Sequence, residues 1–345
     1  MKIGIVTVYN TENCGSFLQA YALCRALEKQ GHQVYFLKGL TSTENRYWYR
    51  LLQATKYVLK CDFLTARELT ETYPVYHLLQ KKFQITEELQ DLDLIIYGSD
   101  TIWNIANGYF LKNWKHFFGH GVKTRKISYA ASVGSTTLDA FVNVPEIKTC
   151  LSEFSGLGIR DIPTGEIVHA FLPEREDVVQ VVDPTMLLAC EDYEAISAEC
   201  PERNFILVYY FGAMPEELTQ KIRAFAKSQN KKIIAFGNRP WADITLPFDP
   251  RLMMGYYKYA DYVVTNTFHG NIFSILFGKQ FVSFGKKKRK VEALLNEFNL
   301  SNRLAEKADE MEEIFMQEID HDAVQQKIKT KREASYQYLE EFLKA

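Results

Sequence analysis

The segment Ala260–Phe284 constrains the fold more than any other part of the chain. An apolar strand, Tyr262–Val264, ends abruptly at the polar turn Thr265–Gly270. An apolar helix, Ile272–Phe277, follows the turn, and a glycine precedes a second apolar strand, Phe281–Phe284. A strand, a helix and a strand in this order predict parallel strands in an α/β sheet. The polar turn then lies at the carboxyl end of the first strand, where such sheets bind ligands.

The start of the chain repeats this pattern. Ile3–Val8 is predicted to be a strand, Ser16–Gln30 a helix and Val34–Leu37 a second strand. Further strands followed by polar turns are predicted at Leu94–Tyr97, Lys126–Ala130, Leu157–Ile159 and Val178–Val182. After an acidic, turn-rich stretch, a second set begins with a strand at Phe205–Tyr210, a helix at Pro215–Ser228 and a strand at Lys232–Phe236.

The length and composition of the chain predict two domains. With 345 residues and 47% hydrophobic content, the chain can bury two cores of ordinary size. We expect an α/β protein with two Rossmann-like domains, 1–185 and 204–320, which face one another across a cleft. Residues 186–203 form the linker, and a final helix within 321–345 can pack back on the N-terminal domain. The aromatic and basic segment 44–63 is predicted to be an inserted helix that packs on the protein, lies on a membrane surface or covers the cleft.

Charge and hydropathy exclude several classes of protein. The net charge of −2 and the pI near 6.4 give no reason to expect nucleic acid as a partner. Neither a signal peptide nor a long apolar run is found. We therefore expect a cytoplasmic protein, with peripheral contact to the inner membrane surface as an open alternative.

Metal sites and disulfides are not expected. The six cysteines are scattered without a C-x-x-C pair, which is typical of reduced and mostly buried thiols. Asp91 and Asp93 precede a strand instead of following one, and glycines interrupt the helix that would carry His116 and His120.

His269 is the strongest candidate for chemistry. At the start of a helix its charged form is disfavoured by the helix dipole, so we expect an imidazole that is uncharged near pH 7 and able to exchange protons. The backbone N–H groups of Gly270 and Asn271 are expected to hold an anionic group of the substrate. Thr265 and Phe268 belong to the same turn. The alternative is a purely structural histidine.

Two other turns are unusually polar, and the first of them is suited to a sugar. Asp100 leads to Trp103 and Asn104, which combines a carboxylate with an aromatic ring, although Asp100 can instead cap a helix while Trp103 packs in the core. The loop from Asn10 to Gly15 contains no glycine-rich phosphate motif, so a dinucleotide cofactor is not expected. Gln19 either contacts a ligand or forms a capping box with Ser16.

Several cations can bind an anion. Arg160 ends a strand and can form bidentate hydrogen bonds with a carboxylate or phosphate, or pair with Asp161. The run Lys286–Lys290 gives a local positive field or is simply solvated. Arg239 follows another strand and is either an anion ligand or a surface residue.

Together these motifs resemble the polysaccharide pyruvyl transferase family. The resemblance extends from residue 3 to about residue 303. It rests on Asn13-x-Gly15 with Leu18–Leu23, Tyr97–Asp100 with Trp103-Asn104, Ser128–Ser132, Ile159–Asp161, Asp183–Thr185, and Thr265-x-x-Phe268-His269-Gly270-x-x-Phe273-Ser274.

The resemblance implies a fold like that of GT-B glycosyltransferases. It also implies transfer of the pyruvyl group of phosphoenolpyruvate onto a sugar of a cell-envelope, capsular or exopolysaccharide glycan, as a ketal. His269 and Arg160 fall on positions associated with phosphoenolpyruvate recognition or catalysis. The candidates for the donor side are Phe268, Gly270, Asn271, Thr265, Arg239 and Lys286, and those for the acceptor side are Asn13, Gly15, Gln19, Asp100, Trp103 and Asn104.

The predicted substrates are phosphoenolpyruvate and a lipid-linked or nucleotide-linked sugar, with no metal and no other cofactor. Two alternatives stay open at this point. One is a glycosyltransferase that uses a nucleotide sugar on the same scaffold. The other is a non-catalytic relative that binds a glycan during its assembly.

Overall fold

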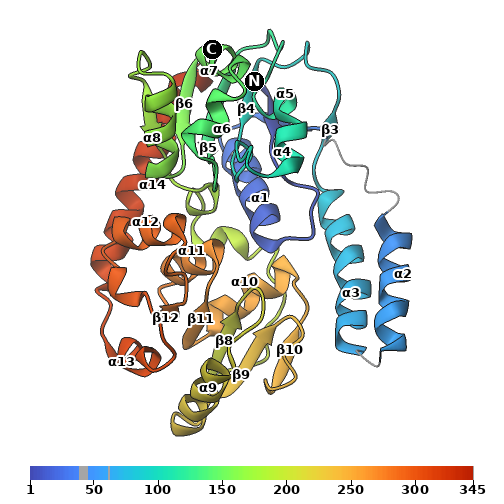
Figure 1. Ribbon diagram of the computed structural model, residues 1–345, viewed down its shortest axis with the longest axis vertical. Helices are drawn as coiled ribbons and strands as arrows, with labels where there is room; N and C mark the ends of the chain where they lie inside the picture. Colours follow the sequence, from blue (N-terminus) through green and yellow to red (C-terminus); the bar gives the residue numbers. More distant parts are fainter. Residues whose placement is uncertain (39–45, 61–62, 345) are drawn as a thin grey trace.

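The computed structural model describes residues 1–38, 46–60 and 63–344, and it contains two parallel sheets (Figure 1). Within these residues the first sheet has seven strands in the order β3-β2-β1-β4-β5-β6-β7. Their bounds are Lys2–Val6 (β1), Gln33–Leu37 (β2), Ile85–Thr86 (β3), Leu94–Tyr97 (β4), Lys126–Ala131 (β5), Gly156–Ile159 (β6) and Val178–Gln180 (β7). The longer predicted strands of this half are all found, with small shifts at their ends.

The second sheet belongs to the C-terminal half. In the described part of the chain it has five parallel strands in the order β10-β9-β8-β11-β12. Their bounds are Phe205–Tyr209 (β8), Lys232–Phe236 (β9), Ile244–Leu246 (β10), Tyr262–Thr265 (β11) and Gln280–Ser283 (β12). Nearly all residues of β8, β9, β11 and β12 are buried, as in parallel sheets covered by helices on both faces.

Helices cover both sheets and connect their strands (Figure 1). In the first half they are α1 (Cys14–Lys29), α2 (Arg46–Leu59), α3 (Phe63–Gln80), α4 (Gly108–Lys112), α5 (Trp114–Phe117), α6 (Leu138–Val142), α7 (Glu146–Ser152) and α8 (Ile162–Phe171). In the second half they are α9 (Glu216–Ser228), α10 (Pro250–Tyr259), α11 (Phe268–Leu276), α12 (Arg289–Glu297), α13 (Glu310–Met316) and α14 (His321–Leu343).

The strand order brings the functional loops together. In each sheet the order reverses at one place, between β1 and β4 in the first and between β8 and β11 in the second. Open α/β sheets bind ligands at the carboxyl ends of the strands beside such a switch point. A cleft is lined by residues that follow all four of these strands, so the two Rossmann-like domains face one another as predicted.

The two halves share a hydrophobic core. One continuous cluster of buried side chains contains Ile3 and Ile96 from the first sheet and Leu207 and Val263 from the second. Helix α14 runs along both halves (Figure 1). Its Tyr338 hydroxyl donates a 2.8 Å hydrogen bond to the carbonyl of Ser128 in β5. The domain boundaries themselves stay a prediction.

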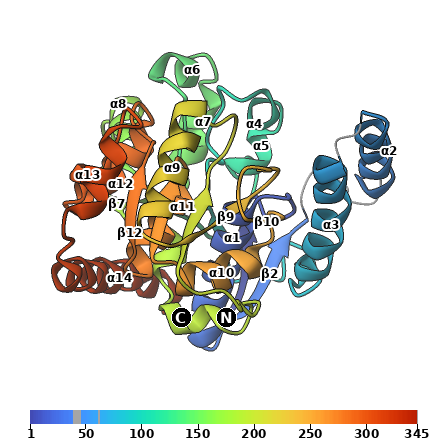
Figure 2. The same ribbon diagram turned by 90° about the horizontal axis from the view of Figure 1, so that it is seen from below.

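The inserted segment is larger than the sequence predicted. Helices α2 and α3 pack against one another and stand out from the side of the molecule, with α2 outermost (Figure 2). Residues 44, 45, 61 and 62 of the predicted segment lie outside the described residues. No helix in the described ranges combines the length and the apolar character needed to span a membrane.

We expect Leu339→Ala in α14 to lower the free energy of unfolding by about 2–5 kcal/mol, because Leu339 is fully buried in the shared core and its truncation leaves a cavity. Glu340→Ala is the matched control, since Glu340 is the exposed neighbour on the same helix and its loss costs less than about 0.5 kcal/mol. Urea denaturation followed by circular dichroism measures both. Equal midpoints for the two variants would show that α14 does not hold the halves together.

Candidate functional site

Helix α11 begins at Phe268, earlier than the sequence predicted, because Thr267 caps it. The Thr267 hydroxyl accepts a 2.9 Å hydrogen bond from the backbone N–H of Gly270. A side chain at Gly270 would meet the hydroxyls of Thr265 and Thr267, so only glycine fits this cap. The N–H of Asn271 donates to the Thr267 carbonyl. The predicted anion site at Gly270 and Asn271 is therefore wrong, and the N–H groups of this first turn that have no partner among the described residues are those of Phe268 and His269.

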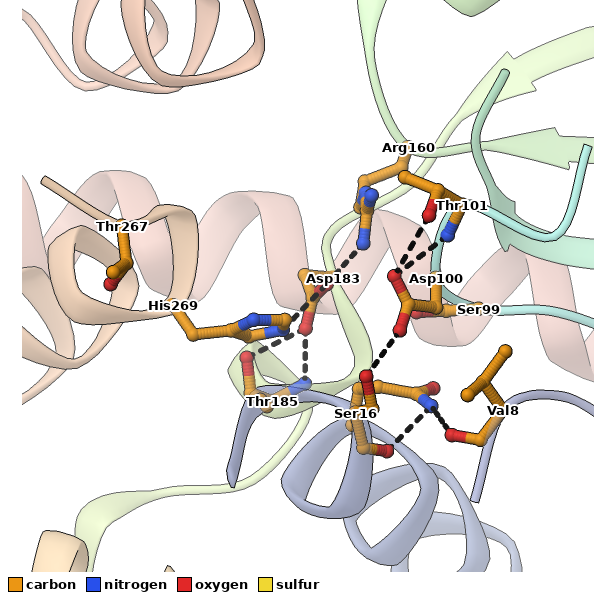
Figure 3. Close-up of polar contacts among 12 residues, drawn as sticks. Val8, Ser16, Ser99, Asp100, Thr101, Arg160, Asp183, Thr185, Thr267 and His269 are labelled. Atoms are coloured by element: carbon orange, nitrogen blue, oxygen red, sulfur yellow. Dashed lines mark hydrogen bonds and ion pairs between the residues drawn. The ribbon is translucent and has the colours of Figure 1, made fainter. Parts of the chain in front are cut away.

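The buried carboxylate of Asp183 brings the two halves of the site together (Figure 3). One carboxylate oxygen lies 3.2 Å from Nη1 of Arg160 and 3.7 Å from Nε2 of His269. The other accepts hydrogen bonds from the backbone N–H and the hydroxyl of Thr185, at 3.1 and 2.7 Å. Arg160 follows β6 in the first domain and His269 lies in α11 of the second, so the tertiary structure joins the two residues that the sequence singled out.

Arg160 keeps part of its hydrogen-bonding capacity unused. Its side chain is only 2% exposed, yet neither Nε nor Nη2 has a hydrogen-bond partner among the described residues. The Asp161 carboxylate is 3.9 Å from Nε, beyond hydrogen-bond distance, because its other oxygen caps α8 through Thr164. The guanidinium lies 4.7 Å from the ring centroid of Phe268. Such a buried and partly unpaired guanidinium is suited to an anionic ligand.

Opposite charges hold the carboxylates of the site ionised. Burial raises the pKa of Asp183, but the His269 ring, the Arg160 guanidinium and the Thr185 hydroxyl outweigh burial and keep that pKa well below its ordinary value. Burial likewise raises the pKa of Asp100, but Arg160, His269 and the Ser16 hydroxyl outweigh burial, and the pKa lies below its ordinary value. The uncharged imidazole of His269 stays a prediction.

Lys290 adds a second cation beside Arg160. Its ammonium lies 5.4 Å from the ring centroid of Phe268, so both cations flank this ring. Burial lowers the pKa of Lys290, which indicates an ammonium group withdrawn from water. Two cations, Arg160 and Lys290, therefore lie where the first turn of α11 meets the first domain, beside the carboxylates of Asp161 and Asp183.

A cleft of about 560 Å³ opens in front of His269. Its lining comes from the loops that follow β1, β4, β8, β11 and β12, together with α4. The lining residues are Val8, Thr11, Asn13, Ser16, Asp100, Thr101, Phe110, Tyr209, Phe211, Asn266, Thr267, Phe268, His269, Lys288 and Lys290. Throughout the described residues, no group of three or more His, Cys, Asp or Glu side chains is arranged to hold a metal ion.

Gly15 allows the two domains to meet at the histidine. A Cβ atom at this position would lie 2.1 Å from Nδ1 of His269, far inside van der Waals contact. The preceding Asn13 caps α1 by accepting hydrogen bonds from the N–H groups of Gly15 and Ser16. The Ser16 hydroxyl in turn donates a 2.7 Å hydrogen bond to Asp100 (Figure 3). Asn13 and Asp100 therefore line the cleft and Gly15 packs against His269, whereas their role on the acceptor side stays a prediction.

Three residues assigned to the acceptor side have structural roles. Trp103 is fully buried, stacks on Phe118 and donates its indole N–H to the carbonyl of Phe117, so the predicted sugar platform is wrong. The Asn104 side chain accepts hydrogen bonds from the hydroxyls of Ser135 and Thr136, outside the cleft lining. Gln19 is fully buried and donates to the carbonyls of Val8 and Ser16, and α1 is capped by Asn13 instead of a capping box.

Five residues assigned to the donor side also lie outside the cleft lining, and one of them, Gly270, is buried in the cap of α11. Arg239 donates to the carbonyls of Tyr210 and Gly212, and thereby ties two loops of the second domain. Lys286 forms an ion pair with Glu306 and lines a separate pocket of the second domain. Thr265 and Asn271 are fully buried beneath the cap of α11. The lysine run therefore reaches the cleft through Lys288 and Lys290, not through Lys286.

Sequence reasoning did not assign several residues that the structure places at the site, chiefly Asp183, Ser16 and Lys290. Asp183 was detectable as a carboxylate directly after the predicted strand Val178–Val182, in the same kind of position as Arg160. The aromatic residues Tyr209, at the end of β8, and Phe211, just after it, line the cleft and are marked in the sequence only by this position.

Two solved structures resemble nearly the whole chain. The UDP-GlcNAc 2-epimerase from Neisseria meningitidis bound to UDP-GlcNAc is 10% identical, with a TM-score of 0.56 and coverage of 100% of both chains. A putative UDP-N-acetylglucosamine 2-epimerase from Listeria monocytogenes is 10% identical, with a TM-score of 0.54 and coverage of 94% of this chain and 90% of the other. At such low identity these likenesses show only the fold, which is of the GT-B type.

Comparison of sequences places the chain in a family. No curated protein sequence gives a significant match to it. The family model described as polysaccharide pyruvyl transferase matches residues 13–287, which cover most of the chain and include Asn13, Gly15, Asp100, Arg160, Asp183 and His269. The protein therefore belongs to the polysaccharide pyruvyl transferase family.

Proposed function

We propose that this protein transfers the pyruvyl group of phosphoenolpyruvate onto a sugar of a cell-envelope, capsular or exopolysaccharide glycan precursor, as a ketal. The observation that carries the proposal is the meeting of Arg160 and His269 on one oxygen of Asp183, with two buried guanidinium nitrogens of Arg160 left without hydrogen-bond partners among the described residues. A small dianionic donor next to a group that exchanges protons accounts for both features.

The donor is proposed to bind between the first turn of α11 and Arg160. Phosphoenolpyruvate carries a carboxylate and a phosphate, which need separate groups of donors. The Nε and Nη2 atoms of Arg160 suit the planar carboxylate. The first-turn N–H groups of α11 and the ammonium of Lys290 suit the phosphate. Phe268, which both cations flank, would exclude water from one side of the donor.

The proposed reaction needs two proton transfers in its first step. A sugar hydroxyl attacks C2 of phosphoenolpyruvate and loses its proton, while the methylene carbon C3 gains a proton and becomes a methyl group. Phosphate then leaves the tetrahedral adduct, and a second hydroxyl of the same sugar attacks C2, loses its proton and closes the ketal. His269 is suited to one of these transfers, because its ring lines the cleft and its Nε2 atom lies 3.7 Å from the Asp183 carboxylate.

The acceptor sugar is proposed to enter the cleft from the side of Asn13 and Asp100. Tyr209, Phe211 and Phe110 supply aromatic surface in the cleft lining, and Asp100 supplies a carboxylate for sugar hydroxyls. These rings replace Trp103 as candidates for stacking against the sugar. The cleft is open enough for a sugar attached to a lipid carrier or to a nucleotide.

We expect His269→Ala to lower kcat roughly 10²- to 10⁴-fold without unfolding the protein, because it removes the proposed proton carrier. Phosphate release from phosphoenolpyruvate, measured with a panel of glycan acceptors, gives the rate. His169→Ala is the control, since His169 is exposed on α8. Wild-type turnover in His269→Ala would contradict the assigned role. Turnover of a nucleotide sugar, with none of phosphoenolpyruvate, would contradict the proposed function itself.

We expect Arg160→Lys to raise KM for phosphoenolpyruvate roughly 10- to 100-fold, because an ammonium keeps the charge but loses the planar pair of donors. Arg289→Lys is the control, since Arg289 is exposed and pairs with Glu166 outside the cleft. Initial rates over a range of donor concentrations separate KM from kcat. Unchanged KM in Arg160→Lys would show that the guanidinium serves only to hold Asp183.

We expect Gly15→Ala to lower kcat by roughly 100-fold, because the added methyl group displaces the His269 ring. Alanine is compatible with the helical backbone at this position, so the fold should persist. Gly108→Ala is the matched control, because a Cβ atom at Gly108 meets nothing within 4 Å. Equal kcat for both variants would mean that the position of the ring does not limit the reaction.

A further inference from the structure

The outward face of helix α2 carries large apolar side chains. Tyr49, Leu52 and Leu59 are 59%, 64% and 85% exposed. Together with Lys56 they follow the spacing i, i+3, i+7 and i+10, which places them on one narrow face of the helix. Ala54, on the opposite side, is buried. An apolar stripe that points away from the body of a protein is typical of a contact surface.

The charges around this stripe are all positive. The stretch 46–60 contains Arg46, Arg50, Lys56 and Lys60 and no acidic residue, although the whole chain has a net charge of −2. Arg50 is paired with Glu12 of the body, whereas Lys56 and Lys60 are exposed next to the apolar side chains. At the far end of α2, exposed Phe63 begins α3 and extends the apolar surface.

We propose that this face of α2, formed by Tyr49, Leu52, Lys56, Leu59 and Lys60, binds the surface of an anionic lipid bilayer. A helix with apolar and aromatic side chains on one face and lysines among them lies in the plane of a membrane surface. The apolar side chains enter the boundary between head groups and acyl chains, while the ammonium groups reach the lipid phosphates.

Charge distinguishes this partner from a second copy of the chain. A symmetric dimer through α2 would bring the lysines of one copy close to those of the other, with no carboxylate in the helix to compensate. An anionic lipid surface complements the same face. The apolar stripe is also too short to enter a bilayer as a spanning segment, since α2 ends at Leu59.

The hairpin formed by helices α2 and α3 is fixed relative to the cleft. Arg50 of α2 forms a 2.9 Å ion pair with Glu12, in the loop that also contributes Thr11 and Asn13 to the cleft lining. Asn238 of the second domain donates a hydrogen bond to the hydroxyl of Thr65 in α3. A membrane held by α2 therefore has a defined orientation relative to the cleft. This surface goes beyond the proposed reaction and does not depend on it.

Sedimentation of the full-length protein with vesicles tests the proposal. We expect binding to vesicles of phosphatidylglycerol and phosphatidylcholine and little binding to phosphatidylcholine alone. Leu52→Glu/Leu59→Glu should lower the partition coefficient at least roughly 10-fold, because the apolar contact is lost. Lys56→Gln/Lys60→Gln should lower it roughly five-fold for each lysine. About 1 M salt should weaken the binding of the wild-type protein to anionic vesicles, as the loss of the two lysines does.

Val142→Glu/Met316→Glu is the matched control, since these residues are 59% and 56% exposed on α6 and α13. It should bind vesicles as the wild type does, and phosphate release from phosphoenolpyruvate with a soluble acceptor should be equal in all variants. Failure of the wild type to bind anionic vesicles would overturn the proposal, whatever the reaction. Equal binding of vesicles by Leu52→Glu/Leu59→Glu and the wild type would also overturn it. So would a wild-type protein that forms a dimer through this face, shown by a monomeric Leu52→Glu/Leu59→Glu variant.

Discussion

The contact of Arg160 and His269 with the buried carboxylate of Asp183 organises the rest of the site. Removing a carboxylate from water costs several kcal/mol, and only well-placed cations and hydrogen bonds offset this cost. Asp183 is held by Thr185 on one oxygen and by the Arg160 guanidinium on the other, and Nε2 of His269 lies 3.7 Å from this second oxygen. Because Arg160 comes from the first domain and His269 from the second, this carboxylate lies where the two domains meet.

The same geometry explains why the site is suited to a small anion. Arg160 and Lys290 flank Phe268, and the first turn of α11 adds its positive end at the same place. Asp183 accepts a hydrogen bond from only one guanidinium nitrogen of Arg160. The guanidinium is therefore held in position, while Nε and Nη2 keep no hydrogen-bond partner among the described residues. Gly15 leaves the space that the imidazole needs. The site therefore depends on backbone positions and side chains from both domains.

How well each residue was predicted depended on whether its role is set by local structure. His269, Asp100 and Asn13 follow predicted strands and line the cleft, and Arg160 follows another predicted strand and lines a second, smaller pocket with Asp183. Trp103 also follows a strand, but it turns back into the core between Ile102 and Ile105, which only packing decides. The anion site was misplaced within α11, because the hydrogen bond from Gly270 to Thr267 starts the helix earlier than the apolar pattern indicates.

The sequence by itself determined the α/β class, the two sets of parallel strands and the polar turns at their carboxyl ends. Apolar periodicity and glycine positions act over a few residues and can be read without knowing the fold. Only the tertiary structure decided that Asp183 lies between Arg160 and His269, that Lys290 and not Lys286 faces the cleft, and that α2 presents its apolar face outward. These facts depend on contacts between residues distant in sequence, and they are set by how the two domains and the hairpin pack.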